Sequence, residues 1–182
     1  MKSVTIFCSS SSNVSPIFFS EIGELAKSLV QNQYRVLYGG SKSGLMGHLA
    51  DQALKLEGEV IGILPDCFNN DDVKHDHLSL MHHTQDLFER KKLMIEQGDA
   101  FVIFPGGLGT LDEALEVITL KQIGLIDKPI VFLDLMDFWK PQLESFVYLK
   151  EHGMISQDLD NLYHVCESHK QVISILNQEL GL

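Results

Sequence analysis

The stretch "DAFVIFPGGLGTLDE", from Asp99 to Glu113, joins two kinds of local structure. The apolar run AFVIF is short and bounded by polar or turn residues, which predicts a buried strand. The prolyl-glycine turn ends that strand, and the residues that follow predict a helix to about Gln122. A strand that opens through glycines into a helix is typical of parallel α/β sheets, where ligands bind at the carboxyl ends of the strands.

The same alternation extends outward in both directions from this stretch. The helix that begins at Pro16 has apolar residues at helical spacing, and a second helix is predicted to end at Gly58, as a C-terminal cap. Further helices are expected over residues 85–97, 139–152 and 170–180. Strands are expected over residues 3–8, 35–40, 59–65, 128–135 and 162–168, a short strand fits residues 78–82, and residues 66–76 are expected to form a polar loop. We therefore predict one Rossmann-like, doubly wound α/β domain over residues 1–182, with a mainly parallel sheet flanked by helices.

Composition and charge limit the classes of function. The chain has 182 residues, of which 45% are hydrophobic and 21% charged, and its net charge is −11. Such an acidic surface argues against binding to nucleic acid or to an anionic membrane, so we expect a small-molecule ligand. The cysteines at positions 8, 67 and 166 form no CxxC pair, which suits free thiols in a reducing compartment. No signal peptide or membrane span is recognisable, so a cytoplasmic protein is expected.

Glycines also follow an earlier strand, in "YGGSKSGLMG" from Tyr38 to Gly47. Gly39 and Gly40 allow the backbone to turn and to approach a ligand closely, and a helix beginning near Gly44 would add unpaired amide donors. Tight packing of strand against helix is the alternative reason for these glycines. The spacing is not GxGxxG, which argues against a dinucleotide site.

The turn at residues 106–110 has two interpretations. Backbone amides of Gly106, Gly107 and Gly109, together with the Thr110 hydroxyl, could hold a phosphate at the start of the helix. Glu113 would then lie one turn further along, on the same side. Alternatively, Thr110 and Glu113 form a capping box that serves the helix alone. The local sequence leaves both open.

Two further clusters of polar residues have both a structural and a functional interpretation. "ERKK" places Arg90 and Lys91 on a helix, where a solvated basic face is the usual explanation, although an arginine fork also suits a phosphate or carboxylate. The histidines of "KHDHLSLMHH" lack the spacing of helical metal ligands and of HExxH, so we expect a polar loop and no metal site. The four histidines of this stretch are His75, His77, His82 and His83.

Taken together, "PGGLGTLDE", "ERK" and "YGG…GLMG" resemble the LOG (Lonely Guy) family. The resemblance runs over nearly the whole chain, from "FCSS" through "PIVFLD". The family signature PGGxGTxxE is matched in full by Pro105, Gly106, Gly107, Gly109, Thr110 and Glu113.

The resemblance implies hydrolysis of the N-glycosidic bond of a nucleoside 5′-monophosphate, such as AMP or a cytokinin ribotide. It assigns the catalytic roles to Arg90 and Glu113, and it implies a homodimer. Family members have often been labelled lysine decarboxylases, but no lysine here has a recognisable pyridoxal-phosphate setting, so we expect neither a cofactor nor a metal. The resemblance places the nucleotide against Gly39, Gly40, Ser41, Lys91, Gly106, Gly107, Gly109 and Thr110.

The chain departs from the family pattern at three positions in or near the expected pocket. Ser41 replaces a third glycine, Phe88 replaces a histidine, and Leu108 stands where tyrosine is frequent. These changes leave the base preference open. The alternatives to a hydrolase are a non-catalytic nucleotide sensor, an NAD-dependent oxidoreductase and a molybdenum-cofactor carrier. A pure binder has no need of a carboxylate at the sugar, and "FCSSSSNVS" lacks the glycines of an NAD site.

Overall fold

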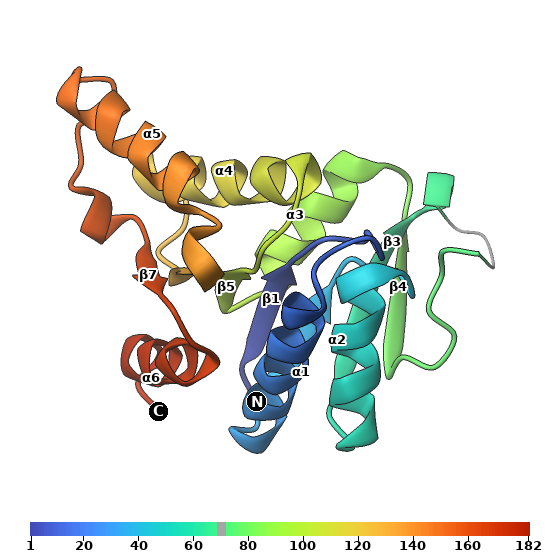
Figure 1. The fold of residues 1–182 in the computed structure, drawn as a ribbon. Coiled ribbons are helices and arrows are strands. Elements are labelled where there is room, and N and C mark those ends of the chain that lie inside the picture. Colours follow the sequence, from blue (N-terminus) through green and yellow to red (C-terminus); the bar gives the residue numbers. More distant parts are fainter. Residues whose placement is uncertain (69–71) are drawn as a thin grey trace.

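A parallel β-sheet organises the protein. The computed structural model describes residues 1–68 and 72–182, and in these residues seven strands pair in the order β4-β3-β2-β1-β5-β6-β7, every pair parallel (Figure 1). The expected α/β fold with a doubly wound parallel sheet is thus confirmed. The strands are β1 (Ser3–Phe7), β2 (Arg35–Tyr38), β3 (Val60–Pro65), β4 (Leu80–Thr84), β5 (Ala100–Ile103), β6 (Ile130–Leu133) and β7 (His164–Cys166).

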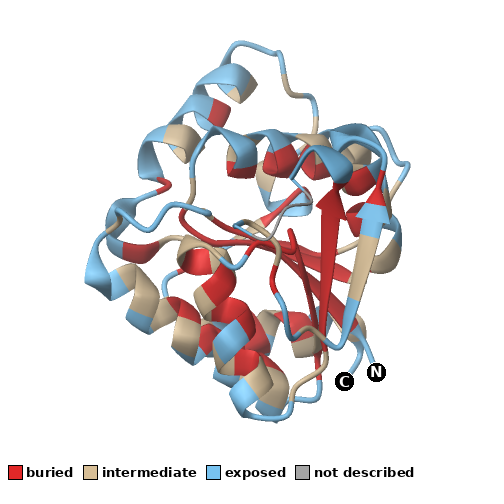
Figure 2. Cartoon of the chain, turned by 90° about the vertical axis from the view of Figure 1, so that its right-hand side faces the viewer, coloured by how far each residue is buried: buried red, intermediate tan, exposed pale blue. Residues whose placement is uncertain are grey.

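Helices cover both faces of the sheet. Apolar side chains of α1, α2 and α6 pack on one face, and those of α3, α4 and α5 pack on the other. Figure 2 shows the central strands as the most continuously buried part of the chain, as expected for strands covered on both faces. The helices are α1 (Pro16–Gln31), α2 (Gly44–Lys55), α3 (Leu87–Gln97), α4 (Leu108–Gln122), α5 (Lys140–Glu151) and α6 (His169–Leu180).

The strand order reverses between β1 and β5. From β1 the chain winds outward through β2 and β3 to β4, and it then returns to the other side of β1 to form β5. The loops that follow β1 and β5 therefore diverge at the carboxyl edge of the sheet. Such a switch point is where doubly wound sheets bind ligands.

Several boundaries differ from those expected from the sequence. Helix α4 begins at Leu108, two residues before Thr110. The short strand expected at residues 78–82 is β4, which runs from Leu80 to Thr84, so His82 and His83 lie in a strand and not in a polar loop. Residues 66–68 form a short 3-10 helix. The part of the expected loop at residues 69–71 lies outside the described residues.

The prediction that Gly58 is the C-terminal cap of α2 was wrong, because the helix ends at Lys55 and its cap is Leu56. The left-handed residue at this end is Glu57, with φ of 58°, and the amides of Glu57 and Gly58 donate to Leu54 and Ala53 in the pattern of a Schellman motif. Gly58 is needed for space, because a Cβ there would collide with Val30 on α1. Packing between helices thus explains this glycine.

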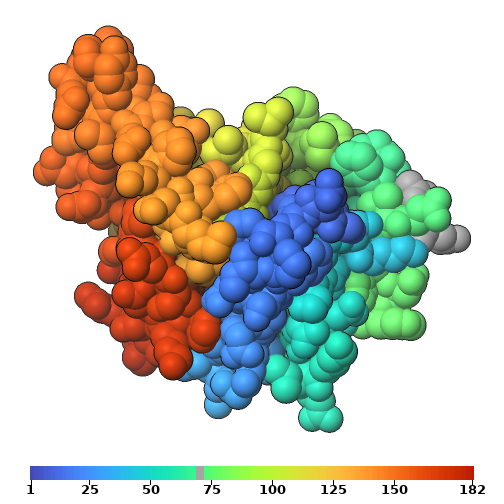
Figure 3. Space-filling model, in the orientation of Figure 1, coloured from blue at the N-terminus to red at the C-terminus, as the bar shows by residue number. Residues whose placement is uncertain are grey.

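Helix α5 is less embedded than the other helices. Figure 3 shows it projecting from the body of the molecule, and its buried residue is Phe146. Within the described part of the chain, no helix has the length and apolar character needed to cross a bilayer.

Candidate active site

A cavity of about 570 Å³ lies at the carboxyl edge of the sheet. Its walls come from the loops after β1, β2, β3 and β5 and from the first turns of α3 and α4, so it occupies the switch point. This volume falls in the range of small-molecule sites. The lining residues are Cys8, Ser9, Ser10, Gly39, Ser41, Ser43, Met46, Leu64, Pro65, Phe68, Val73, Leu87, Arg90, Gly107, Gly109, Thr110 and Glu113.

Arg90 enters this cavity from the first turns of α3. The helix begins at a well-formed cap, in which Asp86 accepts a 2.8 Å hydrogen bond from the Glu89 amide and Glu89 accepts one of 2.7 Å from the Gln85 amide. The Arg90 side chain is 11% exposed. Its Nε donates to the Ile63 carbonyl at 3.2 Å, so the guanidinium is fixed against the end of β3.

Gly39 makes room for this arginine. A Cβ on Gly39 would collide with Arg90 Nη2, and it would also press on Met46. A side chain after β2 is therefore incompatible with the observed position of the guanidinium. Gly39 serves the cavity by permitting Arg90 to lie across it.

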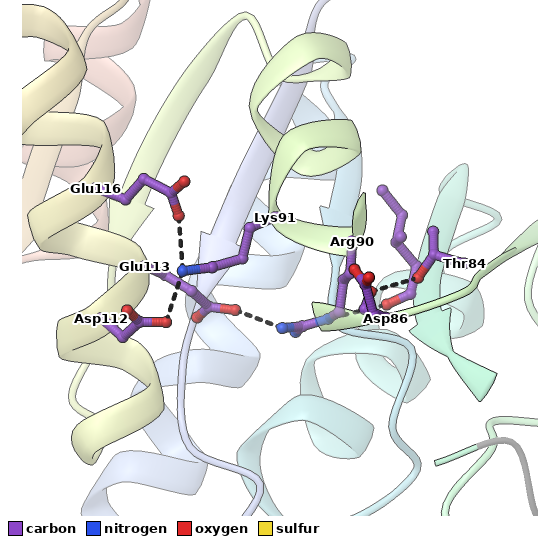
Figure 4. Close-up of polar contacts among 8 residues, drawn as sticks. Thr84, Asp86, Arg90, Lys91, Asp112, Glu113 and Glu116 are labelled. Atoms are coloured by element: carbon purple, nitrogen blue, oxygen red, sulfur yellow. Dashed lines mark hydrogen bonds and ion pairs between the residues drawn. The ribbon is translucent and has the colours of Figure 1, made fainter. Parts of the chain in front are cut away.

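Glu113 faces Arg90 from α4 (Figure 4), and Oε1 accepts a hydrogen bond from Arg90 Nη1 at 2.9 Å. Burial raises the pKa of the Glu113 carboxyl above its usual range, although the charge and hydrogen bond of Arg90 act to lower it. The residue is 5% exposed and lines the cavity. The capping-box alternative does not hold, because α4 is capped by Gly107 and Thr110 lies inside the helix.

The turn before α4 contains glycines of two kinds. A Cβ on Gly106 would collide with the side chain of Thr110, so packing requires that glycine. At Gly107 and Gly109 an added Cβ would meet nothing within 4 Å, and neither residue has a positive φ. Both line the cavity together with Thr110. The first amides of α4 have no acceptor within the helix, so the backbone at this edge can receive an anion.

Lys91 does not line the cavity, contrary to the expectation from the sequence. Its ammonium lies 2.9 Å from Asp112 and 2.9 Å from Glu116, both on α4 (Figure 4). Burial acts to lower the pKa of Lys91, but the hydrogen bonds and charges of Glu116 and Asp112 together raise it. The lysine thus stays charged and joins α3 to α4 beside the Arg90–Glu113 pair.

The glycines after β2 have mostly structural causes. Gly40 has φ of 76° and lies outside the cavity lining, packed against Leu64 and Met81. Side chains at Gly44 and Gly47 would collide with the backbone of Ser10 and Lys42. The packing explanation therefore accounts for these three glycines, and Gly39 is the one in this turn that opens onto the cavity.

The three departures from the family pattern lie in different places. Ser41 lines the cavity and is 6% exposed. Phe88 and Leu108 are 79% and 86% exposed and are not among the lining residues. Ser41 is therefore the departure that bears directly on a bound molecule.

Sequence reasoning missed the residues that directly follow β1. Ser9 and Ser10 line the cavity, beside the buried thiol of Cys8. Burial raises the pKa of that thiol far above its ordinary value and the charge of Glu113 adds to the effect, so the sulfur stays protonated and is no nucleophile. The serines could have been found from the strand order, because β1 borders the switch point.

The histidines form no metal centre in the described residues. His75 is buried, its Nε2 lies 3.4 Å from Asp51, and its Nδ1 accepts from the His77 amide at 3.3 Å. Across residues 1–68 and 72–182, no group of three His, Cys, Asp or Glu side chains could hold a metal ion.

Fold and cavity define a doubly wound α/β protein with a small-molecule site at the switch point of its sheet. Comparison with known proteins then gives the family: residues 46–176 match the family model described as "Possible lysine decarboxylase". A cytokinin riboside 5′-monophosphate phosphoribohydrolase of Rhodococcoides fascians is 34% identical over 180 residues, which cover 96% of this chain and 89% of that protein. The probable cytokinin riboside 5′-monophosphate phosphoribohydrolase LOG6 of Arabidopsis thaliana is 36% identical over 155 residues, covering 85% of this chain and 77% of that protein. The chain belongs to the LOG family of phosphoribohydrolases.

Solved structures share the fold at lower identity. The molybdenum cofactor binding protein of Rippkaea orientalis superposes with a TM-score of 0.75 at 20% identity, covering 99% of this chain and 98% of that one. The molybdenum cofactor carrier protein of Chlamydomonas reinhardtii also gives a TM-score of 0.75 at 20% identity, with coverage of 100% and 99%. These likenesses establish the Rossmann-like architecture and no shared ligand.

Proposed function

We propose that this protein hydrolyses the N-glycosidic bond of a nucleoside 5′-monophosphate to give the free base and ribose 5-phosphate. The proposal rests on family membership and on the buried Arg90–Glu113 pair in the cavity. The relatives named above are hydrolases of this kind, which disfavours a purely sensing role.

The phosphate is assigned to the first turn of α4. The observation that carries this assignment is the pair of glycines at 107 and 109, which no protein contact and no backbone angle requires. Space kept free beside unpaired helix amides is what a phosphate needs. The hydroxyls of Ser9, Ser10 and Thr110 lie in the same lining and can donate to its oxygens.

Glu113 is assigned to the sugar. As the bond between C1′ and the base breaks, positive charge develops on the ribose, and a carboxylate stabilises such an oxocarbenium-like centre. Glu113 also orients the attacking water and takes one of its protons, the water oxygen bonds to C1′ as the bond to the base breaks, and the proton then passes to the departing base, so that Glu113 is ionised again. Within the described residues Glu113 has one hydrogen bond, to Oε1, so Oε2 remains for the water or the sugar.

Arg90 is assigned two tasks. It offsets the negative charge that the phosphate brings close to Glu113, and it holds the carboxylate in place. Its Nε bond to Ile63 and its contact with Gly39 fix the guanidinium before any substrate arrives. A preorganised site of this kind does not reorganise during the reaction.

A base-release assay tests the proposal. Purified protein is incubated separately with AMP, GMP, CMP, UMP and isopentenyladenosine monophosphate. Free base and ribose 5-phosphate are measured by chromatography, and hydrolysis should produce them in equal amounts. We expect release of base from at least one nucleotide, at a rate that Glu113→Gln lowers on the order of 10²–10³. Absence of any base release, with the nucleotide still bound, would favour the sensor.

We further propose a cytoplasmic homodimer that joins through the outer faces of α3 and α4. Phe88, Leu108 and Leu115 are exposed large apolar residues on these helices, and Phe88 and Leu108 directly adjoin residues that line the cavity. Exposed apolar patches mark interfaces. A cytoplasmic location agrees with three cysteines that form no disulfide. The double variant Phe88→Asp, Leu108→Asp should sediment with half the molecular mass of the wild-type dimer. An unchanged mass would rule out this face as the dimer interface.

A further inference from the structure

The two ends of the cavity differ in chemistry. Towards α4 the lining is polar, with serine hydroxyls, Thr110 and open backbone. Towards the end of β3 and the start of α3 the lining is apolar apart from Arg90, whose guanidinium is already bonded to the Ile63 carbonyl and to Glu113. This apolar wall consists of Leu64, Pro65, Phe68 and Leu87.

The strand order sets the distance between these ends. β3 and β5 are separated in the sheet by β2 and β1. At about 4.8 Å between neighbouring strands, the loops after β3 and β5 lie roughly 14 Å apart. This separation suits an extended mononucleotide with its phosphate at α4 and its base at the end of β3.

The ion pair lies between the two ends. Arg90 binds the Ile63 carbonyl on β3 through Nε and Glu113 on α4 through Nη1. A ribose beside Glu113 therefore points its phosphate to one side and its base to the other. The apolar wall is the surface that such a base would meet.

Phe68 is distinctive within this wall. Its side chain lines the cavity and is nevertheless 45% exposed, as Leu87 is at 44%, whereas Leu64 is buried. An aromatic ring held at the mouth of a cavity can stack on a flat base at little cost in side-chain entropy. Stacking needs only a π-face and does not read the polar edge of the base.

We infer that Phe68 binds the base by stacking, and that the contact area of its ring sets how tightly the site holds one base relative to another. This inference rests on the proposed orientation of the mononucleotide. A purine offers more stacking area than a pyrimidine. Discrimination by area leaves adenine, guanine and N6-alkylated adenine as comparable ligands.

Equilibrium binding tests the inference separately from turnover. Dissociation constants are measured for AMP, CMP and ribose 5-phosphate in the Glu113→Gln background, in which turnover is too slow to deplete the nucleotide during the measurement. Phe68→Ala should weaken AMP binding roughly 10-fold, CMP less, and ribose 5-phosphate less than twofold, because ribose 5-phosphate has no base. Phe68→Trp should restore AMP binding, and the melting temperature should stay constant because Phe68 is half exposed.

The outcomes separate the two proposals. If Phe68→Ala weakens the binding of AMP and of ribose 5-phosphate equally, or leaves the affinity for AMP unchanged, the role of Phe68 is overturned. With wild-type Glu113, kcat for AMP should change less than KM in Phe68→Ala, and a loss confined to kcat also overturns it. If the wild-type protein releases no base but Phe68→Ala still weakens AMP binding more than ribose 5-phosphate binding, the hydrolase proposal fails and the proposed stacking of the base on Phe68 stands.

Discussion

Arg90 Nη1 donates to Glu113 Oε1 at 2.9 Å, and the two side chains are 11% and 5% exposed. The bond connects α3 to α4 across the carboxyl edge of the sheet. A buried pair of opposite charges is costly to break from one side, because the remaining charge loses its partner without regaining water. The pair is thus both a structural joint and the chemical centre of the cavity.

Removing Arg90 alone should destabilise the protein. Arg90→Met leaves Glu113 buried and unpaired, at a cost of about 3–5 kcal/mol in the free energy of unfolding. The lost partner raises the pKa of Glu113 further, so the cost should shrink as pH falls and the carboxyl becomes protonated, and grow as pH rises. Denaturant unfolding at several pH values measures this. The control is the double variant Arg90→Met, Glu113→Gln, which should be less destabilised because no buried charge is left unpaired. Equal destabilisation of the single and double variants would contradict the coupling between Arg90 and Glu113.

Gly109→Ala should separate folding from binding. An added Cβ there meets nothing of the protein, and alanine favours a helix over glycine by up to about 1 kcal/mol, so the melting temperature should hold or rise. Affinity for ribose 5-phosphate should fall at least 10-fold, because the methyl occupies space assigned to the phosphate. Calorimetric titration measures this fall. The matched control is Gly106→Ala, which collides with Thr110 and should lower the melting temperature. Unchanged affinity in Gly109→Ala would remove the phosphate from this turn.

The fall of kcat/KM at acid pH should follow the protonation of the Glu113 carboxylate. The ionised carboxylate is the active form and burial raises its pKa, so activity should fall as pH drops through a midpoint above the ordinary 4.5. Asp112 contributes to the raised pKa through its charge. Asp112→Asn should therefore move the midpoint to lower pH, in a pH–rate profile measured in one buffer series. A midpoint below 4.5, or one that Asp112→Asn leaves in place, would assign this fall to another group.

Lys91→Met should impair positioning without abolishing chemistry. Lys91 binds Asp112 and Glu116 on α4 but does not line the cavity, so it acts on the substrate only by holding α3 against α4. We expect stability to fall by roughly 1–2 kcal/mol and kcat to fall less than in Glu113→Gln. The dissociation constant of ribose 5-phosphate should not change. A large rise in that constant would place Lys91 on the phosphate.

The sequence predicted the alternation of strands and helices because buried parallel strands and amphipathic helices have different periods. It also indicated the glycine turn at 106–110 and, through the family resemblance, the Arg90–Glu113 pair. It could not locate the start of α4, because Gly107 and Thr110 are both acceptable caps. Which residues the Lys91 side chain contacts depends on which helix packs beside α3, and local sequence does not determine that tertiary packing.

The apolar wall escaped prediction for a related reason. Phe68 lies in a polar stretch, and nothing local distinguishes it from an isolated exposed residue. Its place at the cavity depends on the order in which β3, β2, β1 and β5 pair. Local patterns do not specify strand order, so neither the wall nor the serines after β1 could be assigned from them.

The most direct test of the proposed mechanism is turnover by Glu113→Gln, measured as release of base from the preferred nucleotide alongside calorimetric binding of that nucleotide. The glutamine keeps the size of the side chain and an oxygen for Arg90 but removes the charge. We expect binding within a few-fold of wild type and kcat reduced on the order of 10²–10³. Release of base at the wild-type rate would contradict the role of Glu113 and with it the mechanism.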